Sequence, residues 1–157
     1  MKARNPILPL QYYCPDGEPH LIGDELFVFY HRSTGNSRFL RRMCAEPITV
    51  GSDGRIAEVL PTSIGMGEPY KPGEALYGYQ ACKLANAYID GDTLAVKKGR
   101  AEAVYRYLDE TARSFSSVAF DGTGSAALTA SVNEHGELTI RIEAAEQTAI
   151  RYFTLIR

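Results

Sequence analysis

Turn-forming residues interrupt this chain so often that they leave little room for helices. The apolar runs between the interruptions are short, and they are rich in aromatic and β-branched residues rather than spaced at helical intervals. Such runs are typical of strands, because branched and aromatic side chains pack well on a pleated surface. The sequence therefore predicts an all-β protein.

Two strand regions are expected in the N-terminal part. Residues 25–30 are almost continuously apolar and are followed by turn residues at 33–36, which predicts a strand buried on both faces. Residues 46–50 and 55–59 flank a turn that contains Asp53 and Gly54, and this pattern predicts a hairpin.

A change in composition near Gly67 divides the chain. Glycines and prolines dominate residues 61–78, so we expect an N-terminal part at 1–66 and a C-terminal part at 67–157. Short runs separated by turns at intervals of about 8 to 12 residues predict a jelly-roll-like β-sandwich in the second part. The expected strands there cover 77–84, 87–89, 93–97, 101–108, 116–120, 126–132, 138–142 and 149–156.

The last expected strand carries apolar side chains on both faces, which predicts a central position in its sheet. Strict alternation would place Ile150, Tyr152, Thr154 and Ile156 on one face.

Residues 102–110, which overlap the expected strand at 101–108, are also compatible with a helical turn.

Composition narrows the classes of partner. The chain has 157 residues and a formal net charge of −2, and its most basic cluster is Arg38, Arg41 and Arg42. This balance argues against a nucleic-acid or anionic-membrane partner. The first residues lack the apolar stretch of a secretory signal, so we expect a cytoplasmic protein.

The cysteine spacing favours reduced thiols. Cys14, Cys44 and Cys82 lie far apart and form no CxxC pair, so neither a disulfide framework nor a zinc site is indicated.

The densest group of polar and turn residues lies at 12–20. In an extended segment Asp16, Glu18 and His20 would lie on one face, close enough to shift one another's pKa values. Such shifts are one way to produce a catalytic acid or base. The Pro15-Asp16-Gly17 sequence is also a turn former, so a purely structural role stays open.

Several motifs resemble family 43 glycoside hydrolases, the arabinofuranosidase and xylosidase group. They are 5–10, 15–20 and 23–29, which resemble the opening of that catalytic domain, 29–36 and 41–48, which resemble its closing strands, and 54–63, which is similar to its exit. The resemblance implies that Asp16 is the general base of an inverting hydrolysis and that His31 lies near the propeller axis. Residues 79–84 and the strands after them resemble a short family 6 carbohydrate-binding module.

The resemblance joins the two ends of a catalytic domain and omits its middle. A five-bladed propeller needs about 20 strands and well over roughly 200 residues, whereas about 65 precede Gly67. Inverting hydrolysis also needs a separately placed acid. Only Glu18 and Glu46 could substitute for it, and neither matches the family's acid motif. We therefore expect residues 1–66 to be a propeller remnant without a complete catalytic site.

The C-terminal part could still bind sugar through tyrosines, since the chain has no Trp. Pyranose rings stack on aromatic rings, and polar groups bind their hydroxyls. We single out Tyr79 and Tyr88, with Glu18 and His20 as further substrate-binding candidates. The wider set comprises Tyr70, Tyr77, Tyr105, Tyr107 and Tyr152, with Asn86, Asp90, Asp92, Asp121 and Asn133. No cofactor or metal is expected, although Asp90-Gly91-Asp92 is compatible with a calcium turn as well as with a hairpin turn.

Three hypotheses follow. The first is a non-catalytic protein that binds arabinose or xylose glycans, and the second is a glycosidase with Asp16 as base. The third is an assembly module, a homodimer formed through exposed strand edges.

Overall fold

The computed structural model describes residues 18–34, 37–106, 108–109 and 111–157, without the side chains of 33–40. This part of the chain is all-β, as predicted, and its only helical element is a single 3-10 turn, η1 (Gly78–Gln80). The strands are β1 (Pro19–Ile22), β2 (Glu25–Thr34), β3 (Ser37–Pro47), β4 (Ala75–Tyr77), β5 (Lys83–Ala85), β6 (Ala87–Asp90), β7 (Thr93–Val96), β8 (Gly99–Tyr105), β9 (Ser114–Phe120), β10 (Ala127–Val132), β11 (Leu138–Ala144) and β12 (Thr148–Ile156).

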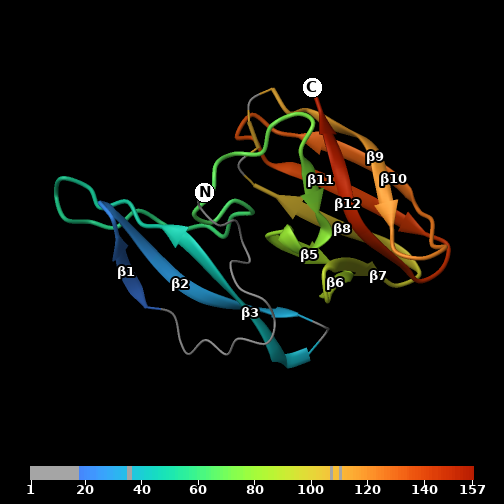
Figure 1. Ribbon diagram of the computed structural model, residues 1–157, viewed down its shortest axis with the longest axis horizontal. Coiled ribbons are helices and arrows are strands. Elements are labelled where there is room, and N and C mark those ends of the chain that lie inside the picture. Colours follow the sequence, from blue (N-terminus) through green and yellow to red (C-terminus); the bar gives the residue numbers. More distant parts are fainter. Residues whose placement is uncertain (1–17, 35–36, 107, 110) are drawn as a thin grey trace.

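The first three strands form an antiparallel sheet in the order β1-β2-β3, here called the N-terminal sheet (Figure 1). Strand β2 begins where predicted and extends four residues beyond the expected end at Tyr30. Phe27 is buried, while Val28 and Phe29 are only half-buried. The near-continuous apolar run of β2 is therefore less enclosed than predicted.

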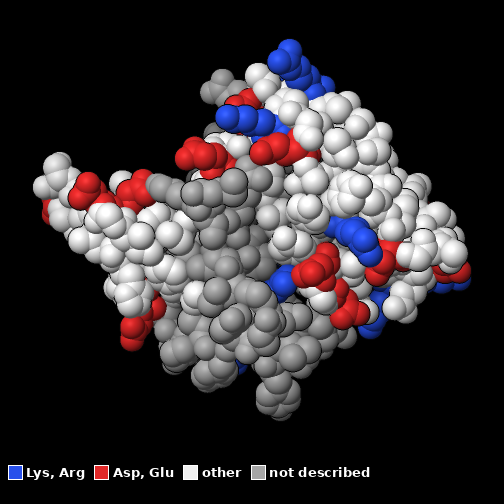
Figure 2. Space-filling view, viewed as in Figure 1, with Lys and Arg blue, Asp and Glu red and all other residues white. Residues whose placement is uncertain are grey.

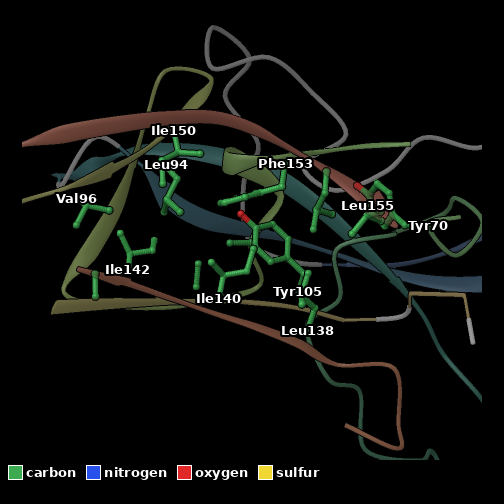
Figure 3. Close-up of a cluster of buried hydrophobic side chains, with 14 of the residues drawn as sticks. Tyr70, Leu94, Val96, Tyr105, Leu138, Ile140, Ile142, Ile150, Phe153 and Leu155 are labelled. Atoms are coloured by element: carbon green, nitrogen blue, oxygen red, sulfur yellow. The ribbon is translucent and has the colours of Figure 1, made fainter. Parts of the chain in front are cut away.

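The remaining strands form two sheets that pack face to face. One has the order β10-β11-β8-β5, and the other contains β4, β12, β7 and β6, with β9 paired to the opposite side of β12. The core lies between them (Figure 3): Leu138, Ile140 and Ile142 of β11 face Leu94, Ile150 and Phe153 from the second sheet. These side chains are almost completely buried, so the sandwich has a dry apolar interior.

Strand β12 is central, as predicted, because it pairs with β4, β7 and β9. The expected alternation of its faces is wrong, however. The register with β9 shifts between Ile150 and Tyr152, so Ile150 and then Phe153 and Leu155 point into the core. A bulge of this kind adds one residue to a strand and reverses the faces beyond it. Arg151, which follows the buried Ile150, lies on the outer face and is exposed.

Three local predictions differ from the structure. The hairpin at 46–59 is reduced to one bridge between Val50 and Ile56, both of which are exposed, so no buried face drives a longer ladder. The expected strand at 77–84 is split by η1, and residues 102–105 continue β8 rather than forming a helical turn.

Two arginines join the N-terminal sheet to the sandwich. Its inner face, defined by Tyr30, Arg32 and Arg42, points toward the sandwich: Arg32 donates a hydrogen bond to the carbonyl of Ala81, and Arg42 contacts the β6–β7 turn. The structure thus gives the N-terminal sheet a packed position against the second part of the chain.

Charges of both signs occur on the surface of the sandwich (Figure 2). On the face in view in Figure 2, acidic and basic side chains are interspersed over the sandwich. In the described part of the chain, no helix has the length and apolar character needed to cross a bilayer.

Candidate functional site

The candidate site is built on the Tyr77-Gly78-Tyr79 segment. Gly78 lies so close to β7 and β12 that an added Cβ would stand 2.4 Å from the Ile150 carbonyl oxygen and 2.7 Å from the Leu94 nitrogen. Only glycine permits this approach. The Gln80 side chain accepts a hydrogen bond from the Tyr77 backbone N–H at 3.0 Å. The 3-10 turn is therefore held tightly on the sheet with a tyrosine on each side of its glycine.

The two tyrosines line an open groove of about 710 Å³, here called the Tyr77 groove. Tyr77 is 39% exposed, and its ring lies 5.5 Å from that of Tyr79 and 5.9 Å from that of Tyr152, measured between centroids. The other lining residues are Asp90, Gly91, Asp92, Thr93, Asp121, Ala149 and Arg151. An accessible aromatic surface is thus surrounded by carboxylates.

Arg42 of β3 completes one wall of this site. Its guanidinium lies 4.9 Å from the centroid of the Tyr79 ring and donates to Asp92 Oδ1 at 2.8 Å and to the Gly91 carbonyl at 3.3 Å. The side chain is only 9% exposed, whereas that of Asp92 is 75% exposed. Burial raises the pKa of Tyr79, and the negative charge of Asp92 adds to this effect, so the phenol stays protonated.

A second arginine and aspartate pair lies on the other side of the groove. Arg151, an exposed residue of β12, donates to Asp121 Oδ1 at 2.8 Å. Neutral sugar hydroxyls both donate and accept hydrogen bonds, so paired carboxylates and guanidinium groups beside an aromatic ring suit them.

The Asp90-Gly91-Asp92 segment forms the hairpin turn between β6 and β7, with Asp90 opposite Thr93 and Gly91 at φ +54°. In the described residues, no group of three or more His, Cys, Asp and Glu side chains is arranged to hold a metal ion. Asp92 is already bound by Arg42. The calcium role of this turn stays a prediction.

The other predicted substrate-binding residues lie elsewhere. Tyr88 lines a separate groove with Lys97 and Lys98. Glu18 and His20 lie at the edge of the N-terminal sheet, where their side chains are 3.5 Å apart and largely exposed. The expected shared face of these two residues is therefore present. Tyr70 and Tyr105 are fully buried in the sandwich core and cannot serve as sugar platforms.

The family resemblance implies two catalytic residues, and the structure describes only one of them, His31. Asp16 lies outside the described residues, as do Cys14 and Tyr107. His31 alternates with Tyr30 and so points to the outer face of β2, and its Nε2 is buried without a hydrogen-bond partner in the described part of the structure.

Glu46 lies on the inner face, opposite to that of His31. Glu46 Oε1 accepts from the Tyr30 hydroxyl at 2.8 Å and the Thr62 N–H at 2.7 Å, and Oε2 accepts from the Thr62 hydroxyl at 2.6 Å. It is 1% exposed, and burial raises its pKa although these hydrogen bonds oppose the shift. The Glu46 carboxyl group therefore joins Tyr30 and Thr62 inside the protein, and a substrate cannot reach it.

The thiols agree with the sequence prediction where the structure describes them. Cys44 and Cys82 are free, and burial raises the pKa of Cys44 to about 11. Such a thiol stays protonated and unreactive at neutral pH.

Sequence reasoning missed Arg42 and Arg151 as parts of the site. Arg42 was considered only as part of a basic cluster, and its contact with Asp92 spans 50 residues of sequence. Arg151 lies in the groove beside Asp121, and this contact spans 30 residues of sequence. Tyr79, which the sequence singled out, lines the groove as the more buried of the two rings, whereas Tyr77 is the more exposed.

Comparison with known proteins gives one local sequence similarity. No family profile matches this chain. A protein from Thermoclostridium stercorarium described as "Xylosidase/arabinosidase" is 41% identical over 64 residues, which are 40% of this chain and 14% of that protein. The chain thus matches a small part of a much longer relative.

A solved structure of a family 43 arabinoxylan arabinofuranohydrolase from Bacillus subtilis, in complex with cellotetraose, aligns with 90% of this chain and 37% of its own length. The TM-score is 0.33 and the identity 13%, so the alignment carries no argument here. The local sequence similarity to the protein described as a xylosidase/arabinosidase is therefore the comparison that is used below.

Proposed function

We propose that this chain is a non-catalytic protein that binds arabinose- or xylose-containing glycans in the Tyr77 groove. One observation carries the proposal: an exposed tyrosine ring lies in an open groove between two arginine and aspartate pairs, Arg42 with Asp92 and Arg151 with Asp121. The apolar face of a sugar ring would stack on Tyr77, and its hydroxyls would bind the carboxylates.

The sugar class comes from the local match to a protein described as a xylosidase/arabinosidase. The non-catalytic assignment is supported by the burial of Glu46, whose oxygens are both occupied by internal donors. It is also supported by the position of the exposed Glu18, which lies at the edge of the N-terminal sheet and does not line the Tyr77 groove. A carboxylic acid that protonates a leaving group must reach the substrate.

The test is calorimetric titration with xylo- and arabino-oligosaccharides. Tyr77→Ala removes the proposed platform, and Ile56→Ala is the control because it deletes an exposed apolar side chain outside the groove. Loss of one aromatic stacking contact should weaken binding by about 1 kcal/mol or more, roughly fivefold or more. A wild-type chain that gives no heat at millimolar oligosaccharide, or equal affinity in wild type and Tyr77→Ala, would overturn the proposal.

The second candidate is an inverting glycosidase with Asp16 as general base, and the same local match favours it. Release of nitrophenol from an aryl arabinofuranoside or xyloside, abolished by Asp16→Asn, would support this function. Release that Asp16→Asn leaves unchanged would exclude Asp16 as the base.

A further inference from the structure

A second groove lies where the chain crosses twice between the two sheets of the sandwich. Strand β5 pairs with β8 in one sheet and β6 with β7 in the other, so the β5–β6 and β7–β8 connections both pass from sheet to sheet. Because Ala87 pairs with Val96, the residues just outside this pair, Asn86 and Lys97, come from adjacent connections. Asn86 Nδ2 donates to the Arg100 carbonyl at 3.3 Å, which ties the two connections together.

Two left-handed backbone positions make these crossings tight. Asn86 has φ +53° and Gly99 has φ +113°. A left-handed conformation at a residue other than glycine is uncommon and costs free energy, which marks Asn86 as a specially held position. The groove enclosed there has about 470 Å³ and is lined by Asn86, Ala87, Tyr88, Lys97, Lys98 and Arg100. We call it the basic corner.

The charge of the basic corner is unbalanced. Lys97 and Lys98 are exposed and have no carboxylate within ion-pair distance among the described residues, although the chain as a whole is slightly acidic. Arg100 is paired with Glu143 only at 3.6 Å, and its side chain is 86% exposed. Two adjacent unpaired cations on the β7–β8 connection, close to Arg100 at the start of β8, create a local positive potential that favours an anionic ligand.

The corner also contains groups that suit a sugar. Strand alternation places Tyr88 on the outer face of β6, paired with Ala95 of β7, and Lys97 lies two residues further along the same face. Tyr88 is half-buried, so it offers an edge or part of a ring face at a fixed position. The Asn86 amide oxygen remains available as an acceptor for a hydroxyl.

We propose that the basic corner binds the carboxylate of an acidic sugar unit, such as a uronic acid in a xylan-type glycan. Lys97, Lys98 and Arg100 bind the carboxylate, and Tyr88 contacts the sugar ring. This inference rests on the proposed glycan-binding function and adds a second subsite, which would give the protein a preference for glycans that carry acidic units.

The test compares xylotetraose with xylotetraose that carries one glucuronic acid unit, by calorimetry at low salt. We expect the acidic oligosaccharide to bind about threefold to tenfold more tightly, because two or three exposed charge pairs each contribute modestly. Lys97→Gln with Lys98→Gln should remove this advantage and leave xylotetraose binding unchanged. The matched control, Lys71→Gln with Arg157→Gln, has the same change of charge at exposed positions outside the corner and should keep the advantage.

Each outcome bears on one of the two proposals. Equal affinity for the two oligosaccharides, or an advantage that survives the Lys97 and Lys98 substitutions, would overturn the basic corner. Equally tight binding of a short single-stranded DNA would also overturn it, since the corner would then be a non-specific polyanion site. A third outcome is that the acidic oligosaccharide binds tightly, that xylotetraose does not bind, and that the Lys97 and Lys98 variant loses the binding. This result would support the basic corner and overturn the proposal for the Tyr77 groove.

Discussion

At the scale of single residues, Gly78 sets the position of the groove tyrosines. An alanine there would bring its Cβ within 2.4 Å of the Ile150 carbonyl oxygen, which belongs to the central strand and cannot move aside. We expect Gly78→Ala to lower the free energy of unfolding by about 1 to 3 kcal/mol, the range for overpacking in a well-filled interior. Denaturant unfolding measures this change.

Gly51→Ala is the control for that substitution. Its Cβ would come within 2.8 Å of the Asp53 carboxylate, which belongs to an exposed side chain that can rotate away. We expect a change below about 0.5 kcal/mol. Similar losses in both variants would contradict the close packing of η1 on the sheet.

Glu46 predicts a pH dependence. Burial raises its pKa above the ordinary value of 4.5, so between that value and its higher pKa the folded chain holds a proton that the unfolded chain releases. The stability contributed by this group is complete below pH 4.5 and is lost as the pH rises through the folded pKa. Glu46→Gln removes this dependence.

The measurement is denaturant unfolding of wild type and Glu46→Gln at several pH values from 4.5 to 7. The stability of the variant relative to wild type should rise with pH, by at most about 1.4 kcal/mol per pH unit. A constant difference over this range would show that the carboxyl has the same pKa in both states.

At the scale of elements, β1 predicts self-association, because in the described part of the chain only one of its edges is paired. One side of β1 pairs with β2, and all four of its residues are exposed, with Leu21 at 71%. Unpaired edges that carry apolar side chains invite pairing with another chain. We expect light scattering to detect a dimer of the wild-type chain and a monomer of Leu21→Lys. A wild-type chain that stays monomeric at high concentration would contradict this expectation.

The elements also show what sequence patterns can and cannot predict. The all-β class and the central place of β12 follow from short apolar runs and from apolar residues on both strand faces. The bulge at Arg151 does not, because it depends on how β9 and β12 fit together. The 3-10 turn at 78–80 was missed because its apolar neighbours Leu76 and Tyr77 resemble a continuing strand.

The same limits apply to the candidate site. Tyrosines and aspartates in turns could be identified from the sequence, and several of them line the Tyr77 groove. Their grouping depends on contacts between segments far apart, such as Arg42 with Asp92. The resemblance to a hydrolase directed attention to Asp16, which lies outside the described residues, and to His31, which does not line this groove.

At the scale of the whole molecule, the N-terminal sheet and the sandwich share buried contacts. Arg42 reaches Gly91 and Asp92, and Glu46 binds Thr62 in the segment that leads to the sandwich. Replacing the buried Arg42 guanidinium removes its hydrogen bonds to Gly91 and Asp92 and its contact with the Tyr79 ring, and leaves a shorter side chain in that space. We expect one unfolding transition in the wild type, and a loss of about 1 to 3 kcal/mol in Arg42→Gln.

Calorimetric melting tests this, with Arg55→Gln as the control because that arginine is 90% exposed and paired only with a neighbouring aspartate at 3.5 Å. Two separate transitions in the wild type, or equal stability of the two variants, would mean that the N-terminal sheet is not fixed on the sandwich by Arg42. In that case the contacts of Arg42 with Asp92 and Tyr79 would not hold it at the side of the Tyr77 groove.

The central claim is that the Tyr77 groove binds a neutral glycan. Backbone amide shifts recorded by NMR during titration with a xylo- or arabino-oligosaccharide test it most directly, because they locate the contact on the intact chain. We expect saturable shifts at Tyr77, Gly78, Asp92 and Thr93, which line or adjoin the groove. These shifts should be lost in Tyr77→Ala. No saturable shift at these residues, or shifts confined to the N-terminal sheet, would contradict it.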